Sequence, residues 1–463
     1  MNQLDTIAAV STPYGKGGIA VLRISGEDAL KIAERVFEPK SKKPFSSIES
    51  SKAVYGYIFE YKNGEKRQID DGLAVIFRAP NSFTGENTVE ISCHGGILVT
   101  QKVLSALLSA GARMAGAGEF TKRAFINGKM SLSSAEALGN LLEAESDEQI
   151  SLARAGMKGI LSDSVSEIYN SLCTVLAAIF AKIDYPDEDL AEISLDEMLS
   201  IANENLEKLQ KLADTYSTGK AVSEGIPTVI LGRTNAGKSS LYNRIVGRDA
   251  AIVTDIEGTT RDVLTERANL GRVCLKLSDT AGLREADNLV EQIGIDRAKK
   301  QAEEAELVLA VFDGSRALDN EDNQFIEYLK SLDGVKIAII NKSDLPQSPD
   351  FKNKMAGFDA QISISADRGD GFDALADTVE KLYIDKELDI AKDAIIVSAR
   401  QSSAIASAIA ALEGAIEAIK QQLPLEICCS ETELCLQSLS EFDGRTVSED
   451  IVAKIFSSFC VGK

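Results

Sequence analysis

The chain has 463 residues, of which 44% are hydrophobic and 26% are charged. Because single cores stop growing at roughly 250 residues, this length predicts two to four domains, and the composition excludes disordered and fibrous classes. The net charge of −21 argues against a broad nucleic-acid-binding face, since affinity for phosphate backbones comes from clustered Lys and Arg. Any contact with nucleic acid must therefore use a local basic patch or a partner.

Cysteine usage and apolar runs indicate the compartment. The seven cysteines include no C-x-x-C pair, which is typical of free thiols in a reducing environment. The N-terminal residues lack the basic stretch and the long apolar run of a secretory signal. No segment reaches the roughly 18 to 20 apolar residues needed to span a bilayer. We therefore expect a cytoplasmic protein without membrane contact.

The predicted elements divide the chain into four parts. Residues 1–120 contain short strand-like runs bounded by Gly, Asn and Pro, and they predict a compact α+β domain. Residues 121–220 carry apolar residues at helical spacing. In residues 221–380, β-branched runs alternate with helical segments, as in a parallel sheet with crossover helices. Residues 381–463 return to Ala-rich helix, so the α/β part is inserted into a helical domain.

The strongest motif is "GRTNAGKSS", which begins at Gly232 directly after the strand-like "TVIL" and leads into a helical segment. In this context backbone N–H groups cradle phosphates, Lys238 reaches the β and γ oxygens, and the hydroxyl of Ser239 binds Mg²⁺. The predicted nucleotide contacts in this loop are Asn235, Ala236, Gly237, Lys238, Ser239 and Ser240.

Three further motifs follow in the order that a GTP-binding domain requires. In "DTAG", Asp279 can hold the water shell of the metal ion and the N–H of Gly282 can sense a γ-phosphate. In "NKSD", Asp344 can accept both the ring N–H and the exocyclic amine of guanine, which predicts GTP rather than ATP. "SISAD" completes the wall of the base pocket through backbone contacts. These motifs add Asp279, Thr280, Ala281, Gly282, Asn341, Lys342, Asp344, Ser365 and Ala366 to the predicted contacts.

The segment "TDIEGTTRD" lies between the first two motifs and predicts a loop that orders on GTP and relaxes on hydrolysis. Thr259 and Thr260 can supply a hydroxyl to Mg²⁺ when that loop closes. Leu283 follows "DTAG", where Ras-like proteins place a glutamine that orients water. Hydrolysis therefore needs another polar group and another source of positive charge.

These motifs, together with "DTIAAVSTPYGKGGIAVLRISG", "SFTGENTVE", "GEFTKRAFINGKMSLSSAEAL" and the terminal "FCVGK", resemble the MnmE (TrmE) family over essentially the whole chain. The resemblance implies a multidomain fold with an α+β N-terminal folate-binding-like domain, a helical domain and an inserted Ras-like α/β P-loop GTPase domain. It also implies a homodimer formed through the N-terminal domains and a 5-formyltetrahydrofolate-type cofactor. With the flavoprotein MnmG (GidA), the family adds an aminomethyl or carboxymethylaminomethyl group to C5 of the wobble uridine of tRNA.

The resemblance also implies the roles of individual residues. A potassium ion takes the place of an arginine and is bound by Asn235, Thr259 and the carbonyls of Thr254 and Ile256. Magnesium is bound by Ser239 and Thr260. Glu291 and Lys238 are both catalytic residues, and Glu291 acts through a bridging water.

A second group of implied residues forms the folate site, namely Arg23, Glu86, Lys129 and Lys463. Basic groups there can pair with the carboxylates of the cofactor. Cys460 of "FCVGK" is brought near the folate, where its thiolate can act as a nucleophile toward uridine; a free thiol without chemical role is the alternative.

The residues themselves leave two other functions open. A GTP-dependent binding switch, such as a ribosome-assembly factor, needs no folate chemistry, although such proteins usually carry a basic RNA-binding appendage. A folate-dependent enzyme acting alone on a small molecule, with the GTPase domain as its regulator, is the other alternative. Potassium dependence and folate binding distinguish these hypotheses from the first.

Overall fold

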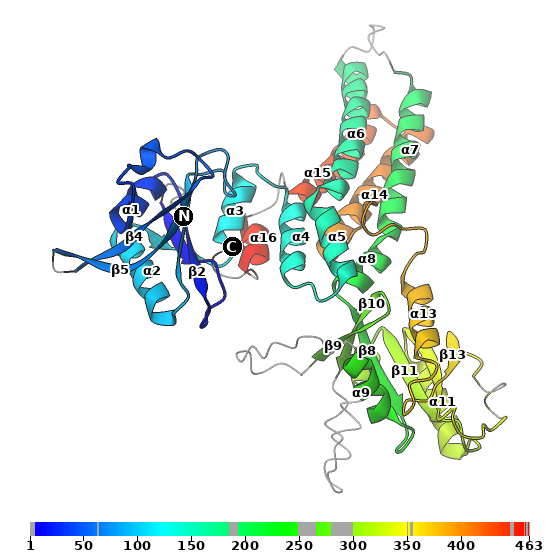
Figure 1. Ribbon diagram of the computed structural model, residues 1–463. Coiled ribbons are helices and arrows are strands. Elements are labelled where there is room, and N and C mark those ends of the chain that lie inside the picture. The colour runs from blue at the N-terminus through cyan, green and yellow to red at the C-terminus, as the bar shows by residue number, and fades with distance from the viewer. Residues whose placement is uncertain are drawn as a thin grey trace. The chain divides into compact units, whose positions relative to one another are not determined.

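The computed structural model describes residues 5–62, 64–184, 193–248, 265–278, 300–349, 351, 355–444, 449–457, 459 and 462. The chain divides into two compact units (Figure 1). One unit comprises Met1–Gly139, Met157–Ser162 and Leu436–Lys463, and the other comprises Asn140–Gly156 and Asp163–Cys435. Each unit contains its own β-sheet and its own hydrophobic cores.

The first unit is built on a seven-stranded sheet in the order β3-β4-β5-β6-β2-β1-β7. Its neighbouring strands are antiparallel, except that β1 and β7 are parallel. Helices α1 and α2 cover one face, because their apolar stripes, represented by Ile32 and Leu107, share a core with Ile58 and Ile91 of the sheet. The elements are β1 (Ile7–Val10), β2 (Ile19–Ser25), α1 (Ala29–Val36), β3 (Phe37–Pro39), the 3-10 helix η1 (Phe45–Ser47), β4 (Ala53–Lys62), β5 (Glu65–Phe77), β6 (Thr88–His94), α2 (Ile97–Ser109), β7 (Arg113–Met114) and α3 (Glu119–Ile126).

The helical part of the chain contains α4 (Leu132–Leu142), α5 (Asp147–Met157), α6 (Ile160–Asp184), α7 (Leu195–Asp214), α8 (Tyr216–Ser223), α14 (Ala399–Lys420), α15 (Leu425–Asp443) and α16 (Glu449–Ser457). Helices α6, α7, α14 and α15 share a core that contains Ile179, Met198, Ala418 and Cys428. Burial raises the pKa of the Cys428 thiol and raises the pKa of Cys435 to about 12. These cysteines are therefore protonated packing residues.

Two stretches are long and apolar enough to cross a membrane by length and composition alone, namely Asp147–Asp184, which holds α5 and α6, and Ala399–Lys420, which is α14. The sequence analysis, which required a run of roughly 18 to 20 apolar residues, did not single out these two stretches. A core helix of a soluble protein passes the same test, and α14 buries one stripe that includes Ile405, Leu412 and Ile416. The apolar length of α14 is thus accounted for by packing between helices.

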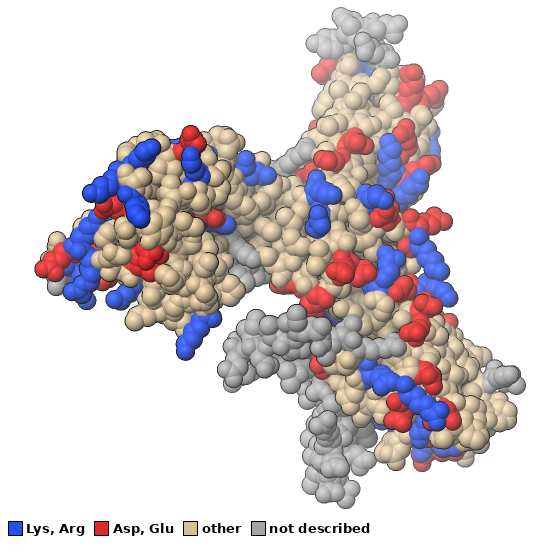
Figure 2. All heavy atoms as spheres, in the orientation of Figure 1, with Lys and Arg blue, Asp and Glu red and all other residues tan. Residues whose placement is uncertain are grey.

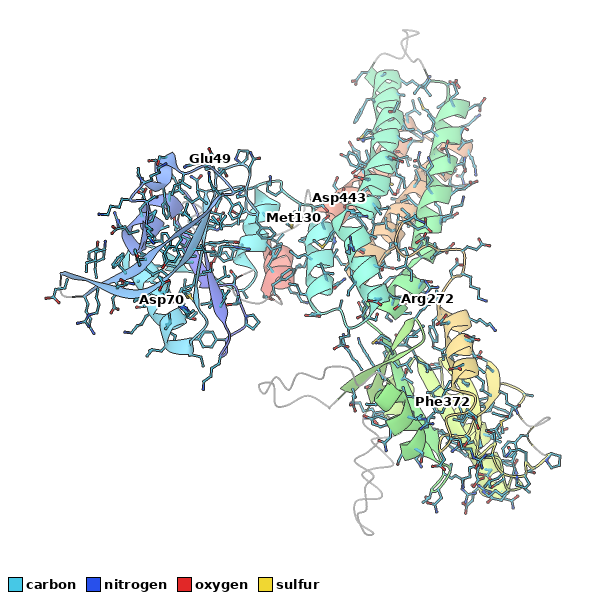
Figure 3. The ribbon with its side chains drawn as sticks, viewed as in Figure 1. Glu49, Asp70, Met130, Arg272, Phe372 and Asp443 are labelled. Atoms are coloured by element: carbon cyan, nitrogen blue, oxygen red, sulfur yellow. The ribbon has the colours of Figure 1, made fainter. Side chains whose placement is uncertain are left out.

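The second unit contains a six-stranded sheet in the order β13-β12-β11-β8-β10-β9. All neighbours are parallel except the β9–β10 hairpin. Helices α9 and α13 contribute to the core on one face and α11 to the core on the other; Phe372, labelled in Figure 3, is fully buried at the start of α13. The elements are β8 (Ile226–Gly232), α9 (Lys238–Arg248), β9 (Thr265–Leu270), β10 (Val273–Ser278), β11 (Leu307–Asp313), α11 (Asn320–Ser331), β12 (Val335–Asn341), β13 (Ala360–Ser363) and α13 (Phe372–Tyr383). Such a doubly covered sheet binds ligands at the carboxyl ends of its strands.

Helix α8, which leads into β8, also contacts the segment that leaves the α/β part before α14. The Thr215 hydroxyl before α8 accepts the N–H of Ile396 at 3.1 Å, and the Thr218 hydroxyl accepts the N–H of Asp385 at 3.0 Å. Gly219 lies against the backbone of Ile396, because a Cβ on Gly219 would be 2.0 Å from the carbonyl oxygen of Ile396. The entry into β8 and the exit into α14 are therefore held side by side.

Gly219→Ala should destabilise the protein by about 3 kcal/mol, because the added methyl group meets backbone that cannot move aside. Gly247→Ala is a matched control, since Gly247 also lies in a helix but has open space around its Cβ position. The control should raise stability by about 0.5 to 1 kcal/mol through helix propensity. Thermal unfolding of both variants measures the difference, and equal shifts would contradict the close approach at Ile396.

Candidate functional site

The loop between β8 and α9 has the geometry of a phosphate-binding loop. Gly232 leaves β8 close against β11, where a Cβ would be 2.5 Å from the carbonyl oxygen of Val311. Gly237 has φ +99°, and a Cβ there would be 2.0 Å from Nδ2 of Asn341. Helix α9 begins at Lys238, and the first N–H groups of a helix have no partner within it. This loop and helix start can therefore surround an anion with backbone donors.

Lys238 is held at the centre of this loop. Its Nζ donates to the carbonyl oxygen of Arg233 at 2.9 Å, and within the described part of the chain it has no carboxylate partner. Burial lowers the pKa of Lys238. A half-buried ammonium without a counter-charge fits a phosphate oxygen, which would supply the missing negative charge. Ser239 and Ser240 follow on the exposed first turn of α9.

Asn341, at the end of β12, connects the phosphate loop to the predicted base site. Its Nδ2 donates to the carbonyl oxygen of Ala236 at 2.9 Å, and its Oδ1 accepts the N–H of Ala366 at 2.9 Å. The side chain is buried, so both bonds form away from water. The structure thus brings together three motifs that lie far apart in the sequence.

The base side of the site follows β12. Lys342 has φ +62° and its Nζ donates to Oδ2 of Asp313 at 2.6 Å. A hydrogen bond from the Ser365 hydroxyl holds the pKa of Asp344 below its usual range, so this carboxylate is charged at neutral pH. An anionic acceptor pair at this position suits the two donors on the Watson–Crick edge of guanine. The Arg368 Nε lies 3.7 Å from Oδ2 of Asp344.

Sequence reasoning missed an ion-pair cluster that fixes the phosphate loop. Nη1 of Arg233 lies 2.6 Å from Oδ2 of Asp319 and 3.3 Å from Oδ1 of Asp322, and Nη2 pairs with Glu321. Asp319 and Asp322 also form the capping box of α11. Asp322 is 3% exposed and binds Arg316 as well, through bonds of 2.7 and 2.9 Å. The side chain of Arg233 therefore ties the phosphate loop to the start of α11.

Several predicted residues of the nucleotide site cannot be placed. Glu291, Thr254, Ile256, Thr259, Thr260, Asp279, Thr280, Ala281 and Gly282 lie outside the described residues. Strand β10 ends at Ser278, directly before Asp279. The described part of the site consequently contains the phosphate loop and the base pocket, and Asn235 is an exposed residue in that loop with φ +62°.

In the first unit, Arg23 and Ser25 near the end of β2 bind Glu90 and Glu86. Arg23 in β2 binds Glu90 through its Nε at 2.9 Å, and its guanidinium lies 5.3 Å from the ring centre of Phe83. Ser25, two residues along the same strand, donates to Oε2 of Glu86 at 2.7 Å. Glu86 is further bound at 3.2 Å by Arg123, a buried arginine that sequence reasoning missed. These contacts hold a cation and an anion in fixed positions next to aromatic rings.

Lys129 and Gly462 each have a described contact in this unit. The Lys129 side chain passes Gly85, and its Nζ donates to the carbonyl oxygen of Pro80 at 3.1 Å. The carbonyl oxygen of Gly462 accepts the Ser11 hydroxyl at 3.0 Å, beyond the end of β1, and β1 places Ala9 opposite Arg23 in β2. Cys460 and Lys463 lie outside the described residues, but Gly462 between them docks beside the strand pair that carries Arg23.

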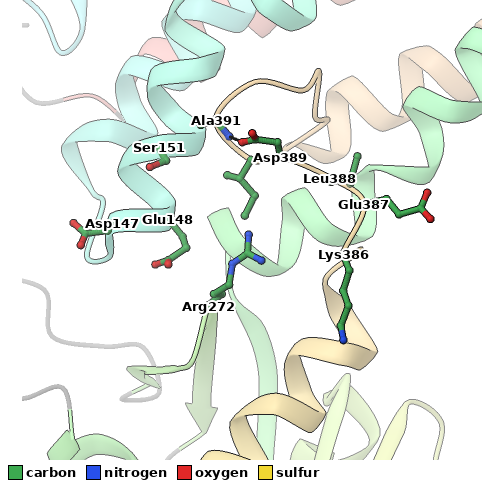
Figure 4. A pocket seen from close by; sticks show the side chains of 10 residues that line it. Asp147, Glu148, Ser151, Arg272, Lys386, Glu387, Leu388, Asp389 and Ala391 are labelled. Atoms are coloured by element: carbon green, nitrogen blue, oxygen red, sulfur yellow. Dashed lines mark hydrogen bonds between the residues drawn. The ribbon is translucent and has the colours of Figure 1, made fainter.

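A separate cavity of about 450 Å³ lies among the first turn of α5, the β9–β10 turn and residues 386–391 (Figure 4). Asp147, Glu148 and Asp389 line it together with Arg272 and Lys386. The β9–β10 turn is fixed there, because Oε1 of Glu380 accepts the N–H of Arg272 at 2.8 Å. No residue of the predicted sites lines this cavity.

Arg233→Ala should weaken nucleotide binding about tenfold, because the phosphate loop loses its attachment to α11. Arg316→Ala is the matched control: it also removes a partner of Asp322 but does not touch the loop, and it should change affinity less than about twofold. Fluorescence titration with labelled GDP measures the affinity, and hydrolysis at saturating GTP separates Kd from kcat. Equal losses in the two variants would show that only the stability of α11 matters.

Asp344→Asn should weaken GTP binding by about a hundredfold or more and improve binding of xanthosine triphosphate, because the amide can donate to the xanthine carbonyl. Competition between the two nucleotides measures the change. If the variant retained its preference for GTP, Asp344 would not contact the base.

The comparisons with known proteins cover the whole length of the chain. The family described as "GTP-binding protein TrmE N-terminus" matches residues 6–129, and the family described as "MnmE helical domain" matches residues 132–460. These matches confirm the predicted multidomain fold class; the four domain boundaries stay a prediction.

Curated relatives agree with these family matches. A tRNA modification GTPase MnmE from Lactococcus lactis subsp. lactis is 42% identical over 463 residues, which is all of this chain and 99% of the relative. The protein of the same name from Thermotoga maritima is 40% identical and that from Clostridioides difficile 38% identical; each match covers 99% of this chain and at least 99% of the relative. The chain belongs to the MnmE family of tRNA modification GTPases.

Proposed function

We propose that the protein is a potassium-activated GTPase that acts with a flavoprotein in the modification of tRNA. Together they add an aminomethyl or carboxymethylaminomethyl group to C5 of the wobble uridine, using a folate one-carbon unit. The observation that carries the proposal is the joining of the phosphate loop to the base pocket by Asn341, in a chain whose relatives are named tRNA modification GTPases.

GTP hydrolysis follows from the roles of the nucleotide residues. Backbone N–H groups around Gly237 and the ammonium of Lys238 bind the phosphates, and Asp344 selects guanine. Ser239 and Thr260 would hold Mg²⁺, which neutralises charge on the β- and γ-phosphates when bound. Ser239 is exposed on the first turn of α9, beside Lys238, which fits that role.

Potassium would be held by Asn235, Thr259 and the carbonyls of Thr254 and Ile256, and it supplies positive charge toward the phosphates when bound. Among these residues Asn235 lies in the described phosphate loop. Glu291 would orient the attacking water through a second water, since Leu283 has no polar group for this purpose.

The first unit would bind a 5-formyltetrahydrofolate-type cofactor. Arg23, Lys129 and Lys463 would bind its carboxylates, and Glu86, fixed by Ser25 and Arg123, would accept from ring donors. Lys129 has no carboxylate partner among the described residues, which leaves its charge available for an anion. Cys460, two residues before Gly462 in the sequence, would be the nucleophile toward uridine.

The partners of the proposed reaction are tRNA, a flavoprotein of the MnmG (GidA) type and a second copy of the chain. We place the protein in the cytoplasm, where tRNA and reduced thiols occur. The acidity of the chain as a whole means that binding of tRNA must use a restricted basic surface or the flavoprotein.

GTP hydrolysis measured in matched potassium and sodium buffers tests the catalytic part of this proposal. We expect at least tenfold faster hydrolysis in potassium, and loss of most of that activity in Glu291→Gln with nucleotide affinity retained. Glu143→Gln, a change of the same kind directly after the end of α4, is the control and should leave the rate unaltered. Equal rates in the two salts would contradict potassium activation.

A further inference from the structure

The charge of the chain is distributed unevenly. Residues 1–129 contain 17 Lys and Arg against 13 Asp and Glu, whereas the remaining residues contain 33 against 58. Residues 1–129, the stretch that ends where the match to the TrmE N-terminus ends, are thus net positive by 4 in a chain with a net charge of −21. Figure 2 shows Lys and Arg spread over this domain, with Asp or Glu beside them at the projecting end of the β4–β5 hairpin. A polyanion would meet a favourable surface here and a repulsive one over most of the remaining chain.

Strand β4 carries a row of aromatic side chains. Tyr55, Tyr57, Phe59 and Tyr61 occupy alternate positions, so they share the face opposite to Ile58, which is buried beneath α1 and α2. Tyr55 is 42% exposed and Tyr61 is 60% exposed. Tyr55 and Tyr57 meet edge to face, with ring centres 5.9 Å apart. This row is therefore a surface feature and not part of the domain core.

Lysines accompany this aromatic row. Nζ of Lys66 lies 3.9 Å from the ring centre of Phe59, and Nζ of Lys40 lies 5.8 Å from that of Tyr55. Lys42 and Lys43 follow Lys40 in an exposed segment. Lys66 is paired with Glu38, but Lys40, Lys42 and Lys43 have no carboxylate partner among the described residues. The charge of these three lysines is thus available to an anionic partner.

We propose that this surface binds the tRNA substrate, an inference that rests on the proposed function. We call it the β4 aromatic face and define it by Tyr55, Tyr57, Phe59 and Tyr61 with Lys40, Lys42, Lys43 and Lys66. Exposed aromatic rings stack on unpaired bases, and adjacent lysines bind the phosphates that connect those bases. Double-stranded RNA offers no free base faces to such a row, so the occupant is a single-stranded loop of the tRNA.

RNA fits this face better than a second copy of the chain does. An isologous contact through the face would bring two copies of the lysine segment 40–43 into one interface, where like charges repel. The face also carries polar groups: the Tyr55 hydroxyl donates to Asp71 at 2.9 Å. A wet, charged and aromatic surface is typical of nucleic-acid contacts.

The test measures binding of fluorescently labelled tRNA to the full-length protein at several salt concentrations. Lys42→Glu/Lys43→Glu should weaken binding at least tenfold and lower the slope of log Kd against log salt by about one to two. Lys31→Glu/Lys102→Glu is the control, because it changes the same charge in the same domain but lies on α1 and α2 over the opposite face. The control should keep most of the affinity and the slope.

A second variant tests base stacking. Tyr61→Ala should weaken binding of tRNA and of a single-stranded oligonucleotide about tenfold, with little change in the salt slope, while Tyr14→Ala, another exposed tyrosine of the domain, should not. Potassium-stimulated GTP hydrolysis should be unaltered in all variants, which shows that they fold.

Three outcomes would overturn the proposed face. One is wild-type binding that neither variant weakens, which leaves the proposed function intact. Another is absence of any tRNA affinity in the wild-type chain, with GTP hydrolysis preserved. The third is loss of tRNA binding that merely follows loss of a dimer in light scattering, which would assign the face to self-association.

Discussion

The nucleotide site depends on one buried amide, that of Asn341. Its two hydrogen bonds join Ala236 in the phosphate loop to Ala366 in the loop after β13. Because an unpaired buried amide is costly, the two loops and the end of β12 stay in register together. Gly237 is part of the same constraint, since any side chain there would occupy the position of the amide. A change in either loop is therefore transmitted to the other.

The sequence was a good guide to what is encoded locally. The phosphate loop, "NKSD" and "SISAD" are consecutive residues at the ends of strands, so spacing alone predicts their arrangement at one edge of a parallel sheet. The attachment of Arg233 to Asp319 and Asp322, the pairing of Glu86 with Arg123 and the docking of Gly462 on Ser11 could not be predicted in this way. Each of these contacts joins residues that are distant in the sequence. The sequence alone does not distinguish a charged side chain that is solvated from one that forms an ion pair. The Ala-rich helix expected after residue 381 is α14, because helical spacing is also a local property of the sequence.

The two units differ in how their charged side chains are paired. In the first unit, acids such as Glu86 and Glu119 are held by arginines, and the pKa of Glu119 is lowered because the bonds from Arg113 and Arg123 outweigh the effect of burial. Lys40, Lys42 and Lys43 of this unit have no carboxylate partner among the described residues. In the second unit, the phosphate loop holds one ammonium, that of Lys238, in a half-buried position. The nearby Arg233 forms an ion pair with Asp319. The positive charge of the first unit is thus distributed over a surface that suits a large anion such as tRNA. The positive charge of the phosphate loop lies at one point that suits a nucleotide.

The contact between Gly219 and Ile396 has a consequence for the history of the chain. Because the α/β part begins and ends at adjacent points on α8, its removal would leave a gap that a short turn could close, and the helices before and after it would keep their common core. A gene fragment for such a part can enter or leave a helical host at one locus, and what it must keep is the contact with Leu152, Ala221 and Val222, which belong to the core of the α/β sheet.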